Sequence, residues 1–178
     1  MVGPLPPGLL AVPALAVAAG VDLYLTLFLL SAAPLLGLWP TLPGALADLS
    51  SPGVLAVTGA CYLAELVAER RFTSSIVWNA LHAVIRPVSG GLLAFLLLDG
   101  QAPALLAGGT VVAALLAFAA HAVATGGHLL LRLERSDRLR PLFPSLLEDT
   151  AVLAVVVLTL DRPVWGAVAT AGLLAIGL

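Results

Sequence analysis

Long apolar runs separated by short polar connections divide the chain into six segments. The segments cover residues roughly 9–38, 53–69, 76–98, 104–131, 145–160 and 164–178. A helix of about 20 apolar residues crosses the ~30 Å hydrocarbon core of a bilayer. The pattern therefore predicts an all-α fold, a multi-pass transmembrane helical bundle of about six spans, in a single integral-membrane domain over residues 1–178. Four full crossings with re-entrant segments are the alternative.

The first segment is too long for one straight span, and it contains residues that interrupt helices. Pro13, Gly20 and Pro34 predict a bend or break within it. Pro87 predicts a second interruption, because it has no N–H to bond the carbonyl of Ala83. Broken helices with free backbone groups near the midplane are typical of transporter sites. We therefore expect at least one broken helix.

Composition supports a membrane location and excludes several classes of protein. The chain is 61% hydrophobic and 10% charged, whereas soluble domains carry about 25% charged residues. Its net charge of −2 provides no basic surface for nucleic acid. The single Cys61 excludes an internal disulfide and a Cys-rich metal site. Residues 1–10 have no positively charged start, so we expect no cleaved signal peptide.

Arginine is distributed unevenly among the connections. Arg70 and Arg71 follow the second segment and four arginines lie within residues 132–140, whereas the connections 39–52 and 99–103 carry only Asp48 and Asp99. Arg162, preceded by Asp161, is the one exception to this alternation. The positive-inside rule places the arginine-rich connections in the cytoplasm. With six spans, both termini are then predicted to be cytoplasmic. Three tryptophans fall at segment ends, as interfacial aromatic residues do: Trp39, Trp78 and Trp165.

Five ionisable residues lie inside the apolar segments and are the main candidates for a substrate or ion pathway. They are Asp22, Glu65, His82, Arg86 and His121. An ionised side chain at bilayer depth costs at least about 2.5–3.5 kcal/mol, so such residues usually face the bundle interior and mark a site. Three further acids are secondary candidates: Glu69, Glu148 and Asp149. We expect a polar vestibule that opens toward the cytoplasm and narrows to Asp22 and Arg86.

Structural roles compete with these functional ones. In one interpretation, Glu69 lies at the membrane interface and pairs with Arg70 or Arg71. Glu148 completes a capping-box pattern with Ser145 at the start of the fifth segment. Arg86 is, in another interpretation, a structural ion-pair partner of Asp22 or Glu65.

The surplus of acids over Arg86 favours a proton, a metal or another cation over an anion as the ligand. No HExxH pattern is present. We therefore assign neither a specific metal ion nor a cofactor. Enzyme motifs such as GxSxG and the Walker loop are also missing, and we assign no catalytic residue.

These features predict a small inner-membrane transporter or channel-like protein with an acidic interior facing the cytoplasm. The alternative is a structural or accessory subunit, with the lipid bilayer and a homo-oligomer or larger membrane complex as partners. Alanines spaced by four, at positions 56, 60, 64 and 68, form a stripe that suits close helix packing. A membrane enzyme acting on a lipid or quinone is the third hypothesis.

Several motifs resemble a known bacterial integral-membrane family. They are residues 20–25 (GVDLYL), residues 62–69 (YLAELVAE), residues 85–90 (IRPVSG), and the stretch from Pro144-Ser145 to Glu148-Asp149. This pattern is similar to that of the family of unknown function catalogued as number 4126. The resemblance covers residues 20–160 and departs from the family pattern at positions 69, 70, 75 and 79. It implies a bacterial inner-membrane location and adds weight to Glu65, Arg86, Pro87, Glu148 and Asp149.

Overall fold

The computed structural model describes residues 7–37, 39, 42, 44–69, 72–134 and 142–176, and it omits the side chains of several residues at helix ends. This part of the chain contains seven α-helices, one short 3₁₀ helix (η1) and no strand. The helices are α1 (Pro7–Val21), α2 (Leu23–Leu35), η1 (Gly44–Leu49), α3 (Pro52–Glu69), α4 (Phe72–Leu97), α5 (Pro103–Glu134), α6 (Leu142–Asp161) and α7 (Pro163–Ile176). The all-α prediction is confirmed.

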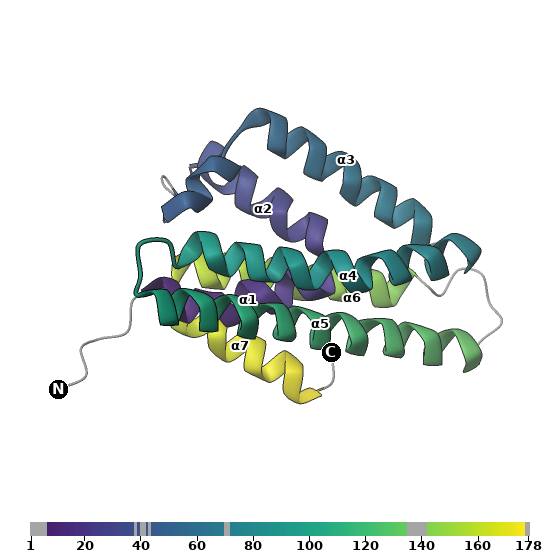
Figure 1. Cartoon of the computed structure of the whole chain (residues 1–178). Helices are drawn as coiled ribbons and strands as arrows, with labels where there is room; N and C mark the ends of the chain where they lie inside the picture. The colour runs from purple at the N-terminus through teal and green to yellow at the C-terminus, as the bar shows by residue number, and fades with distance from the viewer. Residues whose placement is uncertain are drawn as a thin grey trace.

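The first apolar segment folds into a helical hairpin, α1–α2, whose tip lies inside the bundle (Figure 1). Near the start of α1, Gly8 packs against the carbonyl oxygen of Leu97, at the end of α4. It ends where Arg86, near the middle of α4, bonds the carbonyl of Gly20. Asp22 separates the two helices, and α2 then returns beside α3. The predicted break is therefore real, and it reverses the direction of the chain.

The hairpin changes the predicted span count. α1 has 15 residues, about 22 Å of helix, so it enters the bundle without crossing it. Two of the described helices contain stretches long and apolar enough to cross a membrane, Ile76–Leu97 and Pro103–Gly127. Six spans are not confirmed.

The two ends of the described chain do not lie together. The start of α1, η1 and the α4–α5 turn are at one end of the bundle, left in Figure 1, and α7 runs away from that end. The cytoplasmic location of both termini stays a prediction.

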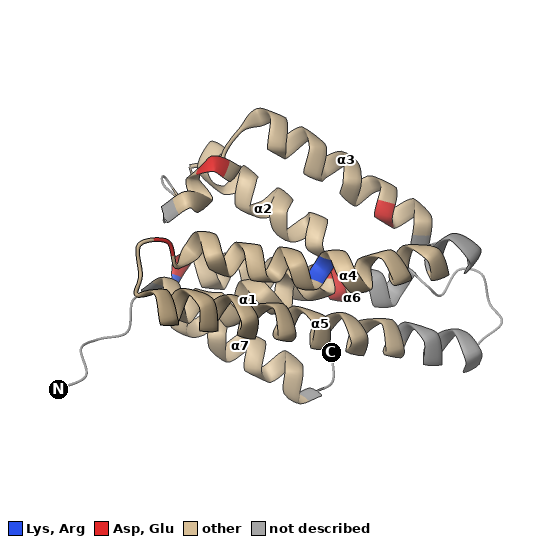
Figure 2. Ribbon diagram, viewed as in Figure 1, with Lys and Arg blue, Asp and Glu red and all other residues tan. Residues whose placement is uncertain are grey.

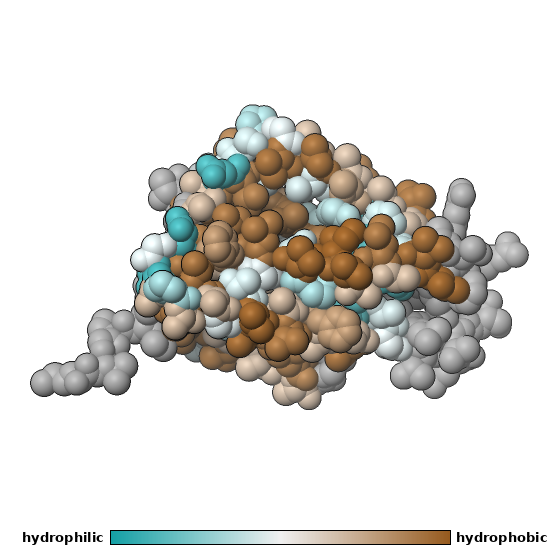
Figure 3. All heavy atoms as spheres, viewed as in Figure 1, coloured by the Kyte–Doolittle hydropathy of each residue, from teal (hydrophilic) through white to brown (hydrophobic). Residues whose placement is uncertain are grey.

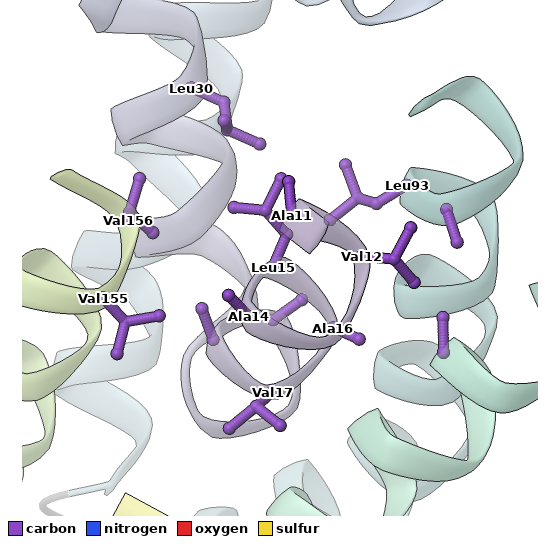
Figure 4. Close-up of a cluster of buried hydrophobic side chains, with 14 of the residues drawn as sticks. Ala11, Val12, Ala14, Leu15, Ala16, Val17, Leu30, Leu93, Val155 and Val156 are labelled. Atoms are coloured by element: carbon purple, nitrogen blue, oxygen red, sulfur yellow. The ribbon is translucent and has the colours of Figure 1, made fainter. Parts of the chain in front are cut away.

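Helix α1 forms the centre of the hydrophobic core. It is apolar on all sides, and every residue from Ala14 to Ala19 is buried. Figure 4 shows it surrounded by Leu30 of α2, Leu93 of α4 and Val155 and Val156 of α6. A helix that is hydrophobic all round belongs in such a position.

Small residues allow α1, α4 and α5 to approach closely. A Cβ added at Gly20 would lie 2.4 Å from the carbonyl oxygen of Ala117, and one added at Gly90 would lie 2.6 Å from the Ala117 Cβ. Ala113 and Ala120 on the same face of α5 are fully buried. This packing fixes the depth at which the hairpin tip stops.

The outer surface is apolar, whereas the interior contains polar groups. Figure 3 shows hydrophobic residues spread across the face formed by α4 and α5, and Figure 2 shows how few charges the helices carry. Exposed side chains include Val77, Val84 and Leu115, each more than 60% accessible. A large exposed apolar surface marks contact with a membrane or a partner. The structure is thus compatible with a membrane protein.

Two local predictions were wrong. Helix α4 continues through Pro87 without a break. Helix α6 starts at Leu142, which places Ser145 inside the helix and removes it from the capping position. The alanine stripe of α3 is exposed at Ala56, Ala60 and Ala64, so within the described residues no helix packs on it.

Candidate functional site

The hairpin tip is where the charged residues meet. At the break between α1 and α2, Arg86 of α4 bonds the end of α1 and also contacts Glu65 of α3 and His121 of α5. Tyr62 of α3 connects this group to Asp149 of α6. The site residues are Asp22, Tyr62, Glu65, Trp78, Arg86, His121 and Asp149. The hairpin therefore assembles groups that are distant in the sequence.

Arg86 closes the end of α1. One terminal nitrogen donates to the carbonyl oxygens of Gly20, at 3.0 Å, and Val21. The last carbonyls of a helix have no partner within the helix, so inside an apolar bundle another donor must bond them. A cation at a helix C-terminus also complements the helix dipole. Arg86 thus holds the hairpin tip in place.

The other terminal nitrogen of Arg86 forms an ion pair with Oε1 of Glu65. The Nε1–H of Trp78 donates to the same oxygen at 3.3 Å. Oε2 of Glu65 is buried and has no hydrogen-bond partner among the described residues. Arg86 is therefore the ion-pair partner of Glu65, as one of the structural interpretations predicted. The second carboxylate oxygen of Glu65 remains an unused hydrogen-bond acceptor.

His121 extends this network to α5. Its Nδ1 lies 3.2 Å from a nitrogen of Arg86, and its Nε2 lies 3.2 Å from the carbonyl oxygen of Asn79. Arginine offers only donors and a carbonyl only an acceptor. The ring must then accept at Nδ1 and donate from Nε2–H, which fixes the tautomer.

Asp22 caps the start of α2. Its backbone is extended (φ −140°, ψ 101°), and one carboxylate oxygen accepts from the N–H of Leu25 at 2.8 Å. The hydroxyl of Thr26 donates to the carbonyl oxygen of Asp22 at 2.6 Å. Aspartate is among the preferred N-cap residues, so the sequence around Asp22 favours a helix start at this point.

Asp149 brings a second carboxyl group to the tip. The hydroxyl of Tyr62 donates to Oδ2 of Asp149 at 2.7 Å. The carboxyl groups of Asp149 and Asp22 are close enough for their charges to interact. A secondary sequence candidate is therefore a central member of the site.

His82 belongs to a neighbouring aromatic cluster. Its Nδ1–H donates to the carbonyl oxygen of Trp78 at 2.8 Å, and the hydroxyl of Tyr24 lies 3.3 Å from its Nε2. The ring stacks on Trp78 with centroids 4.5 Å apart. His82 is fully buried but does not contact the carboxylates, although it shares a helix face with Arg86.

Two secondary candidates from the sequence remain, Glu69 and Glu148. The side chain of Glu69 lies outside the described part of the structure. Glu148 is half-buried beside Asp149. Within the described residues, no three His, Cys, Asp or Glu side chains are grouped as a metal site.

Tyr62 and Trp78 were not predicted as site residues. Tyr62 lies one helical turn before Glu65, a spacing that places both on one face of α3, and this signal could have identified it. Trp78 was interpreted as an interfacial residue, yet its indole N–H bonds Glu65.

Comparison with known proteins gives one family. A family model described as "Domain of unknown function (DUF4126)" matches residues 9–178, nearly the whole chain. No curated protein and no solved structure matches.

Proposed function

The chain belongs to this family of unknown function, and we propose from its site that it is a small transporter or channel-like protein of the bacterial inner membrane. Its ligand is a cation, a proton included, which binds at the acidic group around the hairpin tip. The observation that carries the proposal is the hairpin tip itself, where the ends of two helices and buried charges meet inside the bundle.

The architecture supports transport. Helices that end within the membrane and present backbone groups to a central site are the usual construction of secondary transporters. Here the C-terminal end of α1 faces Arg86, and the N-terminal end of α2 is capped by Asp22. Buried ionisable residues are costly at membrane depth, and a purely structural hairpin does not need three acids.

The charge balance supports a cation. The described part of the site contains three acids, Asp22, Glu65 and Asp149, and one arginine, Arg86, which pairs with Glu65. Three carboxylates against one guanidinium leave two uncompensated negative charges when all are ionised. Such a site attracts a positive ion and repels anions.

The orientation follows from the arginine distribution. The end of α3, the start of α4, the end of α5 and the start of α6 lie together at one end of the bundle (Figure 1), and the arginine-rich connections join them. The positive-inside rule assigns that end to the cytoplasm. The start of α1 then lies on the opposite, extracytoplasmic side.

An accessory role is the second candidate, and the exposed face of α3 favours it. Ala56, Ala60 and Ala64 form a strip of small residues that is open to a neighbouring helix. A stoichiometric partner that co-purifies from native membranes would support this role. The hypothesis of an enzyme acting on a lipid or quinone has less support. It needs His82 and His121 as acid–base residues, but their ring nitrogens are already hydrogen-bonded to backbone carbonyls and neighbouring side chains.

Flux through proteoliposomes tests the proposal. Purified protein is reconstituted with a pH-sensitive dye or a cation-sensitive dye inside, and H⁺, Na⁺, K⁺ and Mn²⁺ gradients are applied in turn. We expect flux of at least one cation above that of empty vesicles, with a large loss in Glu65→Gln. Asp99→Asn, an exposed acid in the α4–α5 turn, is the matched control. Flux absent for every cation, or unchanged in Glu65→Gln, would overturn the proposal.

A further inference from the structure

We propose that one buried water molecule binds between Glu65 and Arg86, where it bridges Oε2 of the carboxylate and the Nε–H of the guanidinium. The site follows from the geometry of the ion pair and does not depend on the proposed transport function.

Both ends of this bridge are buried polar atoms that the rest of the protein does not bond. Oε2 of Glu65 and Nε of Arg86 have no hydrogen-bond partner among the described residues. Glu65 is 2% exposed and Arg86 is 4% exposed. Most buried side-chain polar atoms in proteins have a partner, and a buried group without one costs free energy. Two such atoms on residues in contact therefore indicate a bound molecule.

The two atoms belong to groups that already touch. Oε1 of Glu65 pairs with a terminal nitrogen of Arg86. Oε2 shares its carbon with Oε1, and Nε shares its carbon with that terminal nitrogen. Each unpartnered atom is thus one bond angle away from the ion-pair contact. A single water with a hydrogen bond of about 2.8 Å on each side is long enough to reach both.

Other bonds hold the two groups in this orientation. The indole N–H of Trp78 donates to Oε1 of Glu65 at 3.3 Å. The other terminal nitrogen of Arg86 donates to the carbonyl oxygens of Gly20, at 3.0 Å, and Val21. A rotation that turned Nε toward Oε2 would weaken these bonds. A bridging molecule satisfies both atoms without such a rotation.

The chemistry of the two atoms selects water as this molecule. Oε2 needs a donor, whereas the Nε–H of Arg86 needs an acceptor. Water supplies both, and buried waters typically bond polar groups that lack a protein partner. A metal cation at this point would lie beside the positive guanidinium and accept nothing from it. An anion would lie beside the negative carboxylate of Glu65.

The water also refines the proposed function, and this consequence alone rests on that function. Oε1 of Glu65 is bonded to Arg86 and Trp78, and Oε2 is bonded to the water. A cation that passes the site then meets Glu65 through the water and not at a bare carboxylate oxygen.

A crystal structure grown in a lipidic mesophase tests the site. We expect a density peak at about 2.7–3.2 Å from both Oε2 of Glu65 and Nε of Arg86. In a crystal soaked in Rb⁺, which replaces a bound monovalent cation, we expect no anomalous signal at that position. A direct bond between Nε and Oε2 without a peak, or an anomalous Rb⁺ peak, would overturn the proposal.

Solid-state NMR of the wild-type protein in lipid gives a second measurement that needs neither a crystal nor a variant. Water protons are excited selectively, and their magnetisation is followed to side-chain N–H groups assigned through bonds. We expect faster transfer to the Nε–H of Arg86 than to the Nε2–H of His121. The His121 group is a suitable control because it is equally buried and already bonded to the carbonyl oxygen of Asn79. Transfer to Arg86 that is no faster than to His121 contradicts the bridge.

The two proposals fail separately. A bridging water without flux of any cation supports this site and rejects transport. Flux in a protein with a direct bond between Nε and Oε2 supports transport and rejects the water site.

Discussion

Arg86 and Glu65 form an ion pair inside the bundle, with their side chains only 5% and 3% exposed. The same guanidinium bonds the carbonyls at the end of α1. The pair therefore connects α3 and α4 to the hairpin, and its loss affects three helices together.

The first prediction concerns this pair. Glu65→Gln should lower the free energy of unfolding by about 3–5 kcal/mol, because it leaves a buried arginine without its counter-ion. Denaturant unfolding of the detergent-solubilised protein measures the loss. Asp99→Asn should stay within about 0.5 kcal/mol of the wild type. A Glu65→Gln protein as stable as the wild type would show that the ion pair contributes little.

A second prediction separates the capping role of Asp22 from its charge. Asp22→Ala should destabilise the protein by about 0.5–2 kcal/mol, because the first turn of α2 loses its cap. Asp22→Asn should be closer to the wild type in stability, since asparagine caps equally well. Thermal unfolding compares the two. Equal losses in both variants would indicate that the charge, and not the cap, stabilises the tip.

The third prediction tests the contact between α1 and α5. Gly20→Ala should destabilise by about 1–3 kcal/mol, because the new methyl group meets backbone atoms of Ala117 that cannot move aside alone. Gly108→Ala on α5 is the matched control, since a Cβ there meets nothing within 4 Å. The control should be neutral or stabilising by up to about 1 kcal/mol. A tolerated Gly20→Ala would argue against this helix packing.

The fourth prediction concerns topology. In a Cys61→Ala background, single cysteines are placed at Leu5, two residues before α1, and at Gln101 in the α4–α5 turn. The hairpin predicts that a membrane-impermeant thiol reagent labels both from the extracytoplasmic side of intact cells. Six full crossings predict that the two positions label from opposite sides. The second result would show that the first segment crosses the membrane.

The apolar runs and the ionisable residues within them were sufficient to predict an all-helical fold with a polar interior. Asp22, Glu65, Arg86 and His121 were identified because their burial in an apolar segment is costly unless they meet partners. Asp149 was ranked lower, since a position near a helix start has an ordinary capping explanation. Tyr62 and Trp78 were missed because neither is charged.

By itself, the sequence determined which segments are apolar enough to contact lipid and which acidic residues must be shielded from it. Only the tertiary structure decided that the first segment turns back at Asp22, that Arg86 pairs with Glu65, and that Tyr62 bonds Asp149. Hydrophobicity is a property of each residue and its near neighbours, so it can be read along the chain. The reversal depends on Gly20 and Gly90 fitting against Ala117 and on Arg86 bonding the end of α1, and these contacts join residues 27 to 97 positions apart. Such pairings exist only once the helices have packed.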